Sequence, residues 1–183
     1  MSKTFIGVYD NALIEKECEM LISQFEKSPQ DFGDVFYKGK YQVKPEYKKG
    51  KQLCGSKFSD SSTISNILWT AVDNCLLRYE EEYPPARRGK LDDLNAFKKF
   101  EAEDDGFKMW HCEASSSGTA KRVLVWSFYL NNAKSGTEFL YYPTIRARMG
   151  RCVIYPASST HTHRSSQPNK GPKYFVSGWI SYE

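Results

Sequence analysis

Histidine is scarce in this sequence: its 183 residues include only His111, His161 and His163. The five cysteines are scattered and form no C-x-x-C pair, which argues against a zinc ribbon and against a disulfide framework. No apolar run is long enough for a transmembrane helix, and the start of the chain shows no signal-like segment. We therefore expect a reduced, soluble, cytoplasmic protein without a membrane partner.

Aromatic residues, by contrast, are abundant, at 15% of the chain. Aromatic side chains favour strands and the walls of pockets, so the composition favours a sheet-rich protein. The formal net charge of +4 is mild. It is compatible with acidic partners and does not indicate nucleic-acid binding.

The N-terminal half of the chain predicts a short strand and two helices. The strand is expected at residues 5–9, and Asp10 or Asn11 is expected to cap the first helix. The apolar stripe of that helix consists of Leu13, Cys18, Leu21, Ile22 and Phe25. The second helix follows residues 59–62 and ends before Pro84.

Two charged stretches lie beside these helices. Residues 37–51 are basic and interleaved with tyrosines, which indicates a solvated loop. The alternative is a mobile strand pair or lid over a substrate of acidic or polar character. Residues 87–105 are polar and charged, and predict a shorter helix or an irregular crossing.

From Phe107 onward the pattern changes to strands. The expected strands are residues 107–113, 122–130, 137–142, 145–148, 151–155 and 173–180, with a turn at Met149-Gly150. Helices followed by closely spaced strands predict an α+β chain with a sandwich or barrel in its C-terminal half.

The period-two repeat of the 107–113 strand places His111 and Glu113 on one face. An imidazole and a carboxylate so placed, joined by one more histidine from a distant strand, form a 2-His-1-carboxylate facial triad for Fe(II). His161 and His163 are both candidates for the third ligand. In a strand they share a face, so alternation does not choose between them.

The order of these motifs resembles the 2-oxoglutarate- and Fe(II)-dependent oxygenases, in particular their prolyl-4-hydroxylase-like branch. His111-Cys112-Glu113 matches the family's H-x-D or H-x-E, and the spacing from His163 to Lys173 matches its second histidine and basic residue. Residues 125–131, 136–139 and 150–156 resemble further strands of the branch. The resemblance covers residues 107–183 well and residues 1–30 loosely.

The resemblance implies N-terminal helices packed on a double-stranded β-helix, or jelly roll. It implies a single oxygenase domain over residues 1–183. Residues 1–106 would form the helical support and substrate-loop region, and residues 107–183 the core strands with the metal site. The metal ligands would be His111, Glu113 and His163, because the number of residues between the second histidine and Lys173 matches the family pattern for His163 better than for His161.

The same resemblance assigns the remaining site residues. Lys173 would bind the far carboxylate of 2-oxoglutarate, because a buried ammonium needs an anionic partner. The hydroxyls expected beside that carboxylate are those of Thr137, Tyr129 and Tyr155. The residues expected on the substrate side or behind the ligands are Arg164, His161 and Trp179. The alternative interpretations are a salt bridge of Arg164 with residues 87–105, and an exposed polar role for His161.

The function implied is hydroxylation of a C–H bond, above all in prolyl residues of a protein or peptide, with release of succinate and CO2. The expected cofactors are Fe(II), 2-oxoglutarate and O2, with ascorbate as an optional addition. Alternatives are the same chemistry on a free amino acid, a nucleobase or another small molecule, and a non-catalytic jelly-roll module that binds an acidic partner through residues 37–51. A structural zinc site is the weakest alternative, and the retained carboxylate disfavours halogenation. The sequence leaves the regiochemistry open, and whether the protein is a monomer or a homodimer.

Overall fold

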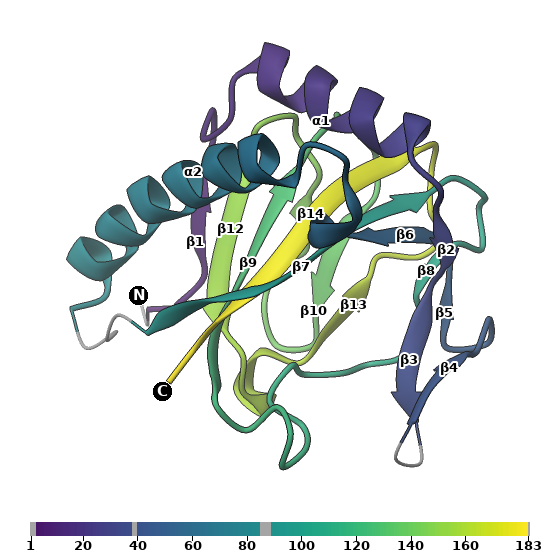
Figure 1. The fold of residues 1–183 in the computed structure, drawn as a ribbon. Coiled ribbons are helices and arrows are strands. Elements are labelled where there is room, and N and C mark those ends of the chain that lie inside the picture. The colour runs from purple at the N-terminus through teal and green to yellow at the C-terminus, as the bar shows by residue number, and fades with distance from the viewer. Residues whose placement is uncertain (1–2, 38–39, 85–88, 183) are drawn as a thin grey trace.

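The computed structural model of the protein describes residues 3–37, 40–84 and 89–182 (Figure 1). The helices are α1 Glu15–Lys27 and α2 Ser61–Glu82, and the 3-10 turns are η1 Gly55–Lys57 and η2 Ser159–His161. The strands are β1 Gly7–Tyr9, β2 Asp31–Phe32, β3 Asp34–Tyr37, β4 Lys40–Val43, β5 Lys48–Lys49, β6 Lys51–Cys54, β7 Lys90–Phe100, β8 Gly106–Phe107, β9 Arg122–Tyr129, β10 Gly136–Phe139, β11 Ile145–Arg146, β12 Cys152–Pro156, β13 His163–Ser165 and β14 Lys173–Ser181. No helix among the described residues is long and apolar enough to cross a membrane.

Two antiparallel sheets face each other behind the helices (Figure 1). The larger sheet has the strand order β1-β12-β9-β14-β7-β6-β2, and the smaller has the order β11-β10-β13. A hairpin of β3 and β4 and a pair of β5 and β8 lie beyond the β2 edge of the large sheet. This is the α+β arrangement with a strand sandwich predicted for the C-terminal half. That residues 1–183 make one domain stays a prediction.

The large sheet has two differently composed faces. Its outer face packs on α1 and α2 through one apolar cluster, to which both Phe128 and Val176 contribute side chains that are 0% exposed. Its inner face looks toward the small sheet, where Val125 and Tyr129 pack against Phe139. Because side chains alternate along a strand, each central strand contributes to both clusters.

The predictions for α2 are confirmed, whereas the predicted cap of α1 is wrong. The Asp60 carboxylate accepts a hydrogen bond from the Thr63 N–H at 3.3 Å at the start of α2. At α1 the N-cap is Ile14, whose N–H donates to the Glu17 carboxylate at 2.9 Å. Asp10 instead forms an ion pair with Arg151 at 2.6 Å, an interaction that joins positions far apart in the sequence.

The helix or irregular crossing predicted for residues 87–105 is also wrong, because residues 90–100 form strand β7 (residues 87–88 lie outside the described part). β7 pairs with β14 on one side and with β6 on the other. Pairing on both sides satisfies the backbone hydrogen bonds of β7. This stabilises the strand although its charged composition is unfavourable for a strand.

The basic stretch of residues 37–51 was predicted first as a solvated loop and, alternatively, as a strand pair. It forms strands, which agrees with the alternative (residues 38–39 lie outside the described part). The strand predicted at residues 107–113 ends at Phe107. Beyond it the chain pairs with β13 only at an isolated bridge between His111 and His163.

Candidate metal centre

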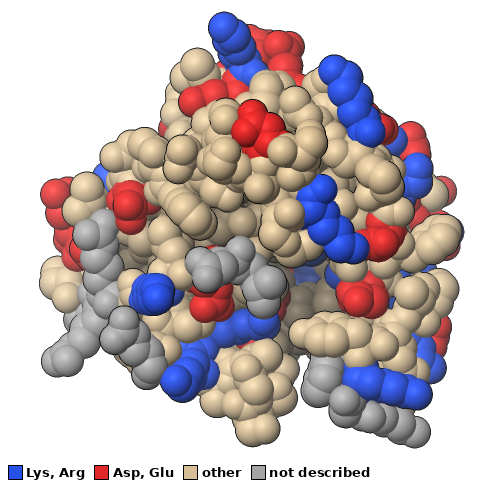
Figure 2. All heavy atoms as spheres, in the orientation of Figure 1, with Lys and Arg blue, Asp and Glu red and all other residues tan. Residues whose placement is uncertain are grey.

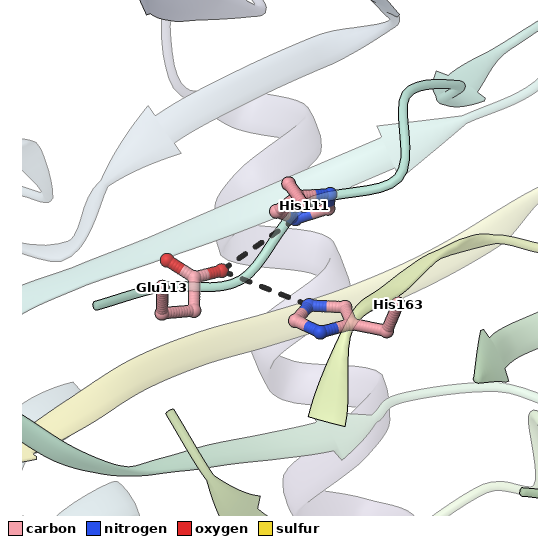
Figure 3. Close-up of side chains that lie close together, drawn as sticks. All are labelled: His111, Glu113 and His163. Atoms are coloured by element: carbon pink, nitrogen blue, oxygen red, sulfur yellow. Dashed lines mark ion pairs between the residues drawn. The ribbon is translucent and has the colours of Figure 1, made fainter. Parts of the chain in front are cut away.

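Three side chains from the irregular segment after β8 and from β13 converge on one point (Figure 3). Glu113 Oε1 lies 3.7 Å from His111 Nε2 and 3.8 Å from His163 Nε2. Nε2 of each histidine and a Glu113 oxygen lie within 4.8 Å of one another. The two Nε2–Oε1 distances are too long for hydrogen bonds, so a group placed between these atoms is needed to join them.

Backbone hydrogen bonds hold this segment in place although it is not a regular strand. His111 and His163 exchange N–H···O=C bonds of 3.0 and 2.9 Å. The Glu113 N–H donates to the Ala157 carbonyl at 3.1 Å, just beyond β12. His111 and Glu113 are therefore pinned to neighbouring strands independently, and their side chains meet without the strand predicted to align them.

The ring hydrogen bonds orient both imidazoles. His111 Nδ1 lies 2.9 Å from the Met109 carbonyl oxygen, and His163 Nδ1 lies 2.9 Å from the His161 carbonyl oxygen. A carbonyl only accepts, so Nδ1 carries the proton and Nε2 presents its lone pair to the centre. Burial lowers the pKa of both rings, and that of His163 falls to about 3. Both rings are neutral at pH 7, as metal ligands must be.

The Glu113 carboxylate is divided between two tasks. Oε2 accepts hydrogen bonds from Trp179 Nε1 at 2.9 Å and from Arg122 Nη1 at 3.3 Å. Oε1 is left facing the two imidazoles. Burial raises the pKa of Glu113, but the two imidazoles and nearby cations outweigh burial and lower it, so the group is ionised. Two imidazole nitrogens and an anion thus lie around one place, an arrangement that a cation bound there would stabilise.

This donor set fits Fe(II). Among the described residues, His111, Glu113 and His163 form the one cluster of three or more metal-binding side chains, and it offers no fourth ligand. A structural zinc ion is closed by four protein ligands, so the set does not favour that alternative. Two imidazoles and one carboxylate that leave positions open are the facial triad of Fe(II) oxygenases.

His161 lies apart from the three ligand atoms. Its ring nitrogens contact the Thr4 carbonyl and the Thr160 hydroxyl, both at 2.9 Å. The ring stacks on Tyr142 and is 3% exposed, so the interpretation as an exposed polar residue is wrong. His161 supports the site through its backbone carbonyl, which orients the ring of His163.

Arg164 forms a salt bridge, but with a different carboxylate from the one expected. Its guanidinium pairs with Glu138 at 3.0 Å on the neighbouring strand β10, where the alternative interpretation expected a carboxylate from residues 87–105. It also lies 4.3 Å from the centre of the Trp110 ring. A substrate contact by Arg164 stays a prediction.

Lys173 is enclosed on the inner face of the large sheet. It is 2% exposed, donates one hydrogen bond of 2.9 Å to the Gly136 carbonyl, and lies over the rings of Phe100 and Phe175. Burial lowers its pKa to about 7. No carboxylate in the described part of the chain is within ion-pair distance of its ammonium.

Three hydroxyls predicted beside Lys173 fall into two places. Tyr129 and Thr137 form a hydrogen bond of 2.7 Å with each other, and Thr137 follows Gly136, the partner of Lys173. The Tyr155 hydroxyl lies instead on the metal side, where it donates to His163 Nε2 at 3.1 Å.

Two residues of the site were missed by the sequence analysis. Arg122 stacks on the Trp179 ring at 3.7 Å while it binds Glu113, and the Phe107 ring stacks on that of His111 at 3.7 Å. Arg122 opens a long apolar strand, where a lone charge was the one available indication. The period-two pattern placed Phe107 on the His111 face without revealing the stacking.

Comparisons with known proteins agree with this site. Residues 96–181 match the family model of the 2OG-Fe(II) oxygenase superfamily. No curated protein matches the sequence.

Solved structures share the fold at low sequence identity. The chain is similar to a viral collagen prolyl hydroxylase from Paramecium Bursaria Chlorella virus-1 in complex with 2OG (TM-score 0.70, 12% identity, covering 98% of this chain and 97% of that one). It is similar to a prolyl hydroxylase from Trichoplax adhaerens in complex with a hypoxia inducible factor peptide (TM-score 0.76, 10% identity, covering 98% and 84%). It is also similar to a non-heme alpha ketoglutarate dependent carbocyclase from nogalamycin biosynthesis (TM-score 0.68, 8% identity, covering 97% and 79%).

These likenesses confirm the predicted jelly-roll fold. The family implies Fe(II), 2-oxoglutarate and O2 as cofactors, and the His-Glu-His cluster supplies the candidate iron site. Ascorbate stays a prediction. By the match over residues 96–181, the C-terminal half of this chain is similar to the 2OG-Fe(II) oxygenase superfamily, and the chain has a prolyl-4-hydroxylase-like fold.

Proposed function

We propose that this protein hydroxylates a C–H bond of prolyl residues in a protein or peptide. The reaction inserts one oxygen atom of O2 into the C–H bond, and the other oxygen atom enters succinate as 2-oxoglutarate loses CO2. The observation that carries the proposal is the convergence of His111, Glu113 and His163 on one point, with the buried and unpaired Lys173 on the inner face of the same barrel.

In this proposal His111, Glu113 and His163 hold Fe(II) through Nε2, Oε1 and Nε2. Iron supplies the activation of O2 when it is bound. The Met109 and His161 carbonyls keep the two rings turned toward the metal, while Trp179 and Arg122 hold the carboxylate from behind. Partners of this kind typically change metal affinity by about 10–100-fold.

Lys173 receives the far carboxylate of 2-oxoglutarate. An isolated buried ammonium is costly, and a carboxylate partner removes that cost. Tyr129 and Thr137, joined by their hydrogen bond, supply hydroxyls beside it. Tyr155 remains a predicted cosubstrate contact at the metal end.

Prolyl substrates are supported by the neighbouring structures, two of which are prolyl hydroxylases and one of which holds a peptide. The carbocyclase supports a second candidate, the same chemistry on a small molecule. The binding-module alternative has less support, because His111, Glu113 and His163 converge and Lys173 is buried on the inner face of the large sheet. Figure 2 also shows Lys/Arg and Asp/Glu side chains interspersed over one face of the molecule, without one continuous basic surface.

The test is an anaerobic titration of the purified protein with Fe(II) and 2-oxoglutarate, followed by the visible charge-transfer band of the chelate. We expect a band that is lost in H111A and H163A and kept in H161A, the matched control. A folded protein without the band would contradict the proposed function.

Substrate class is tested separately, by succinate release with a proline-rich peptide, with free proline and with other free small molecules. Faster release with the peptide supports prolyl residues. Release with free substrates alone would replace them with a small molecule.

A further inference from the structure

Lys98 is a second lysine on the inner face of the large sheet, and the family resemblance gave it no role. It lies on β7 in register with Phe175 of β14, and its ammonium is 5.1 Å from the centre of the Phe175 ring. The Phe175 ring therefore has the ammonium of Lys98 and that of Lys173 as neighbours. Lys98 Nζ donates a hydrogen bond to the Ser177 hydroxyl. No carboxylate of the described residues lies within ion-pair distance of it.

Lys99, the next residue of β7, is a lysine whose charge is compensated by carboxylates of the protein. Lys99 points to the outer face, where its ammonium pairs with Glu26 at 3.0 Å and with Glu101 at 3.3 Å. Of these two adjacent lysines, the outward one has two carboxylates at ion-pair distance, whereas the inward and half-buried Lys98 has none among the described residues and interacts with Glu113 only over a longer distance. A charge on the inner face without a close counter-ion is unfavourable, and a bound anion would compensate it.

Lys48 adds a third inward ammonium near Lys98. It is 7% exposed and donates hydrogen bonds to the Gln52 amide oxygen at 2.6 Å and to the Asp34 carbonyl at 3.1 Å. Gln52 is the register partner of Lys98 on β6. Lys48 belongs to β5 and Lys98 to β7, the strand that pairs with β6.

The β14 residues that Lys98 contacts separate it from Lys173, the proposed cosubstrate anchor. The inward residues of that strand are, in order, Lys173, Phe175, Ser177 and Trp179. Successive inward residues are about 7 Å apart. Lys98 binds at the level of Ser177, between the Lys173 level and the level of Trp179, which holds Glu113.

We propose that Lys98 binds an anionic group of the primary substrate, a carboxylate close to the carbon that is hydroxylated, with Lys48 adding positive charge beside it. The inference rests on the proposed function and names the class of substrate: an acidic one. In the proposed function Lys173 would bind the far carboxylate of 2-oxoglutarate and the metal would bind its other end, so positive charge would match both ends of the cosubstrate. In this assignment neither end of the cosubstrate uses Lys98.

The experiment measures binding by calorimetry to the anaerobic protein loaded with Fe(II) and 2-oxoglutarate. The probes are two pairs that differ in one charge: N-acetyl-L-proline against N-acetyl-L-prolinamide, and the peptide Ala-Asp-Pro-Ala against Ala-Asn-Pro-Ala. We expect the wild-type protein to bind the anionic member of at least one pair ten-fold or more tightly. K98M should abolish that preference and leave 2-oxoglutarate affinity unchanged, and K99M should alter neither.

Several results would overturn the inference. One is a wild-type protein that binds 2-oxoglutarate and prefers no anionic probe, and another is a K98M variant that keeps the preference. A ten-fold loss of 2-oxoglutarate affinity in K98M with the probe preference intact would assign Lys98 to the cosubstrate instead. Failure of the wild-type protein to bind 2-oxoglutarate contradicts the proposed function, and is thereby distinguished from these outcomes.

A second readout separates binding from a structural role. Because K98M replaces an unpaired inward ammonium by an apolar methionine side chain, it should raise Tm by about 2–4 °C, the shift typical of a modest gain in a chain of this size. A lower Tm together with an unchanged probe preference would show that the bond to Ser177 is structural, and would sink the inference.

Discussion

Strands β7 and β14 contribute to both faces of the large sheet, and the two faces have different roles. On the outer face, Val176 and Ile180 are 0% exposed within the apolar cluster under the helices. On the inner face, β14 buries Lys173 and β7 carries the half-buried Lys98, and neither has a carboxylate of the described residues within ion-pair distance. Apolar burial stabilises the fold, whereas a buried ammonium reduces stability until an anion arrives. The period of a strand thus lets one sequence hold a core and a binding site back to back.

The largest effect is expected on the outer face. Phe128 of β9 is 0% exposed in the helix-side cluster, so F128A should reduce the free energy of unfolding by about 3–5 kcal/mol. F128L, which keeps most of the volume, should cost less than about 1.5 kcal/mol. Urea denaturation followed by tryptophan fluorescence measures both. Equal small losses would mean that the helices do not depend on this cluster.

On the inner face we expect the opposite sign. K173M should leave the free energy of unfolding unchanged or raise it, because it removes a buried charge without a carboxylate partner. The same variant should weaken 2-oxoglutarate binding by about 10–100-fold, the loss of one hydrogen bond to a charged group. Denaturation and anaerobic calorimetry test the two halves. If K173M were destabilised and bound 2-oxoglutarate normally, Lys173 would stabilise the fold as the outer-face residues do, and the predicted difference between the two faces would be wrong.

A pH titration sharpens the same contrast. The pKa of Lys173 is lowered to about 7, so its ammonium is present below pH 7 and is lost as pH rises above it. Carboxylate binding needs the ammonium, so the Kd for 2-oxoglutarate should rise above pH 7 by up to about ten-fold per pH unit. K173R, whose guanidinium stays charged, should show a nearly flat profile and acts as the control for pH effects elsewhere. Parallel profiles in the two proteins would contradict the assignment.

For the protein without ligand, the lowered pKa of Lys173 also fixes how its contribution to stability changes with pH. In the unfolded chain a lysine titrates near its ordinary pKa of about 10.4. Between pH 7 and that value the unfolded state binds the extra proton, so the contribution of Lys173 to stability rises with pH.

The smallest effect is expected at the outward lysine. K99M removes the partly exposed ion pairs with Glu26 and Glu101, and should lower the free energy of unfolding by less than about 1 kcal/mol. High salt should shrink the difference further, because it screens exposed pairs. A loss of several kcal/mol would show that Lys99 matters to the fold as much as the apolar cluster does.

Local chemistry made some elements predictable. The apolar repeat and the acidic cap at Asp60 sufficed for α2, since both act within a few residues of the helix. The continuous apolar run sufficed for β9, which is buried on both faces. Strand β7 was missed because its pairing partners, β14 and β6, lie far away in the sequence and override its charged composition.

By itself the sequence determined which groups are available: three histidines, one suitably spaced carboxylate, and a lysine ten residues beyond His163. These identities define the donor set, because ligand type follows from the side chain alone. The tertiary structure decided which histidine takes part, since the turn of η2 carries the His161 side chain away from the centre and β13 brings His163 to it. It also decided that Lys98 faces inward without a counter-ion while Lys99 faces outward with two. The orientation and neighbours of a side chain depend on strand register and on the layer opposite, and contacts between residues distant in the sequence set both.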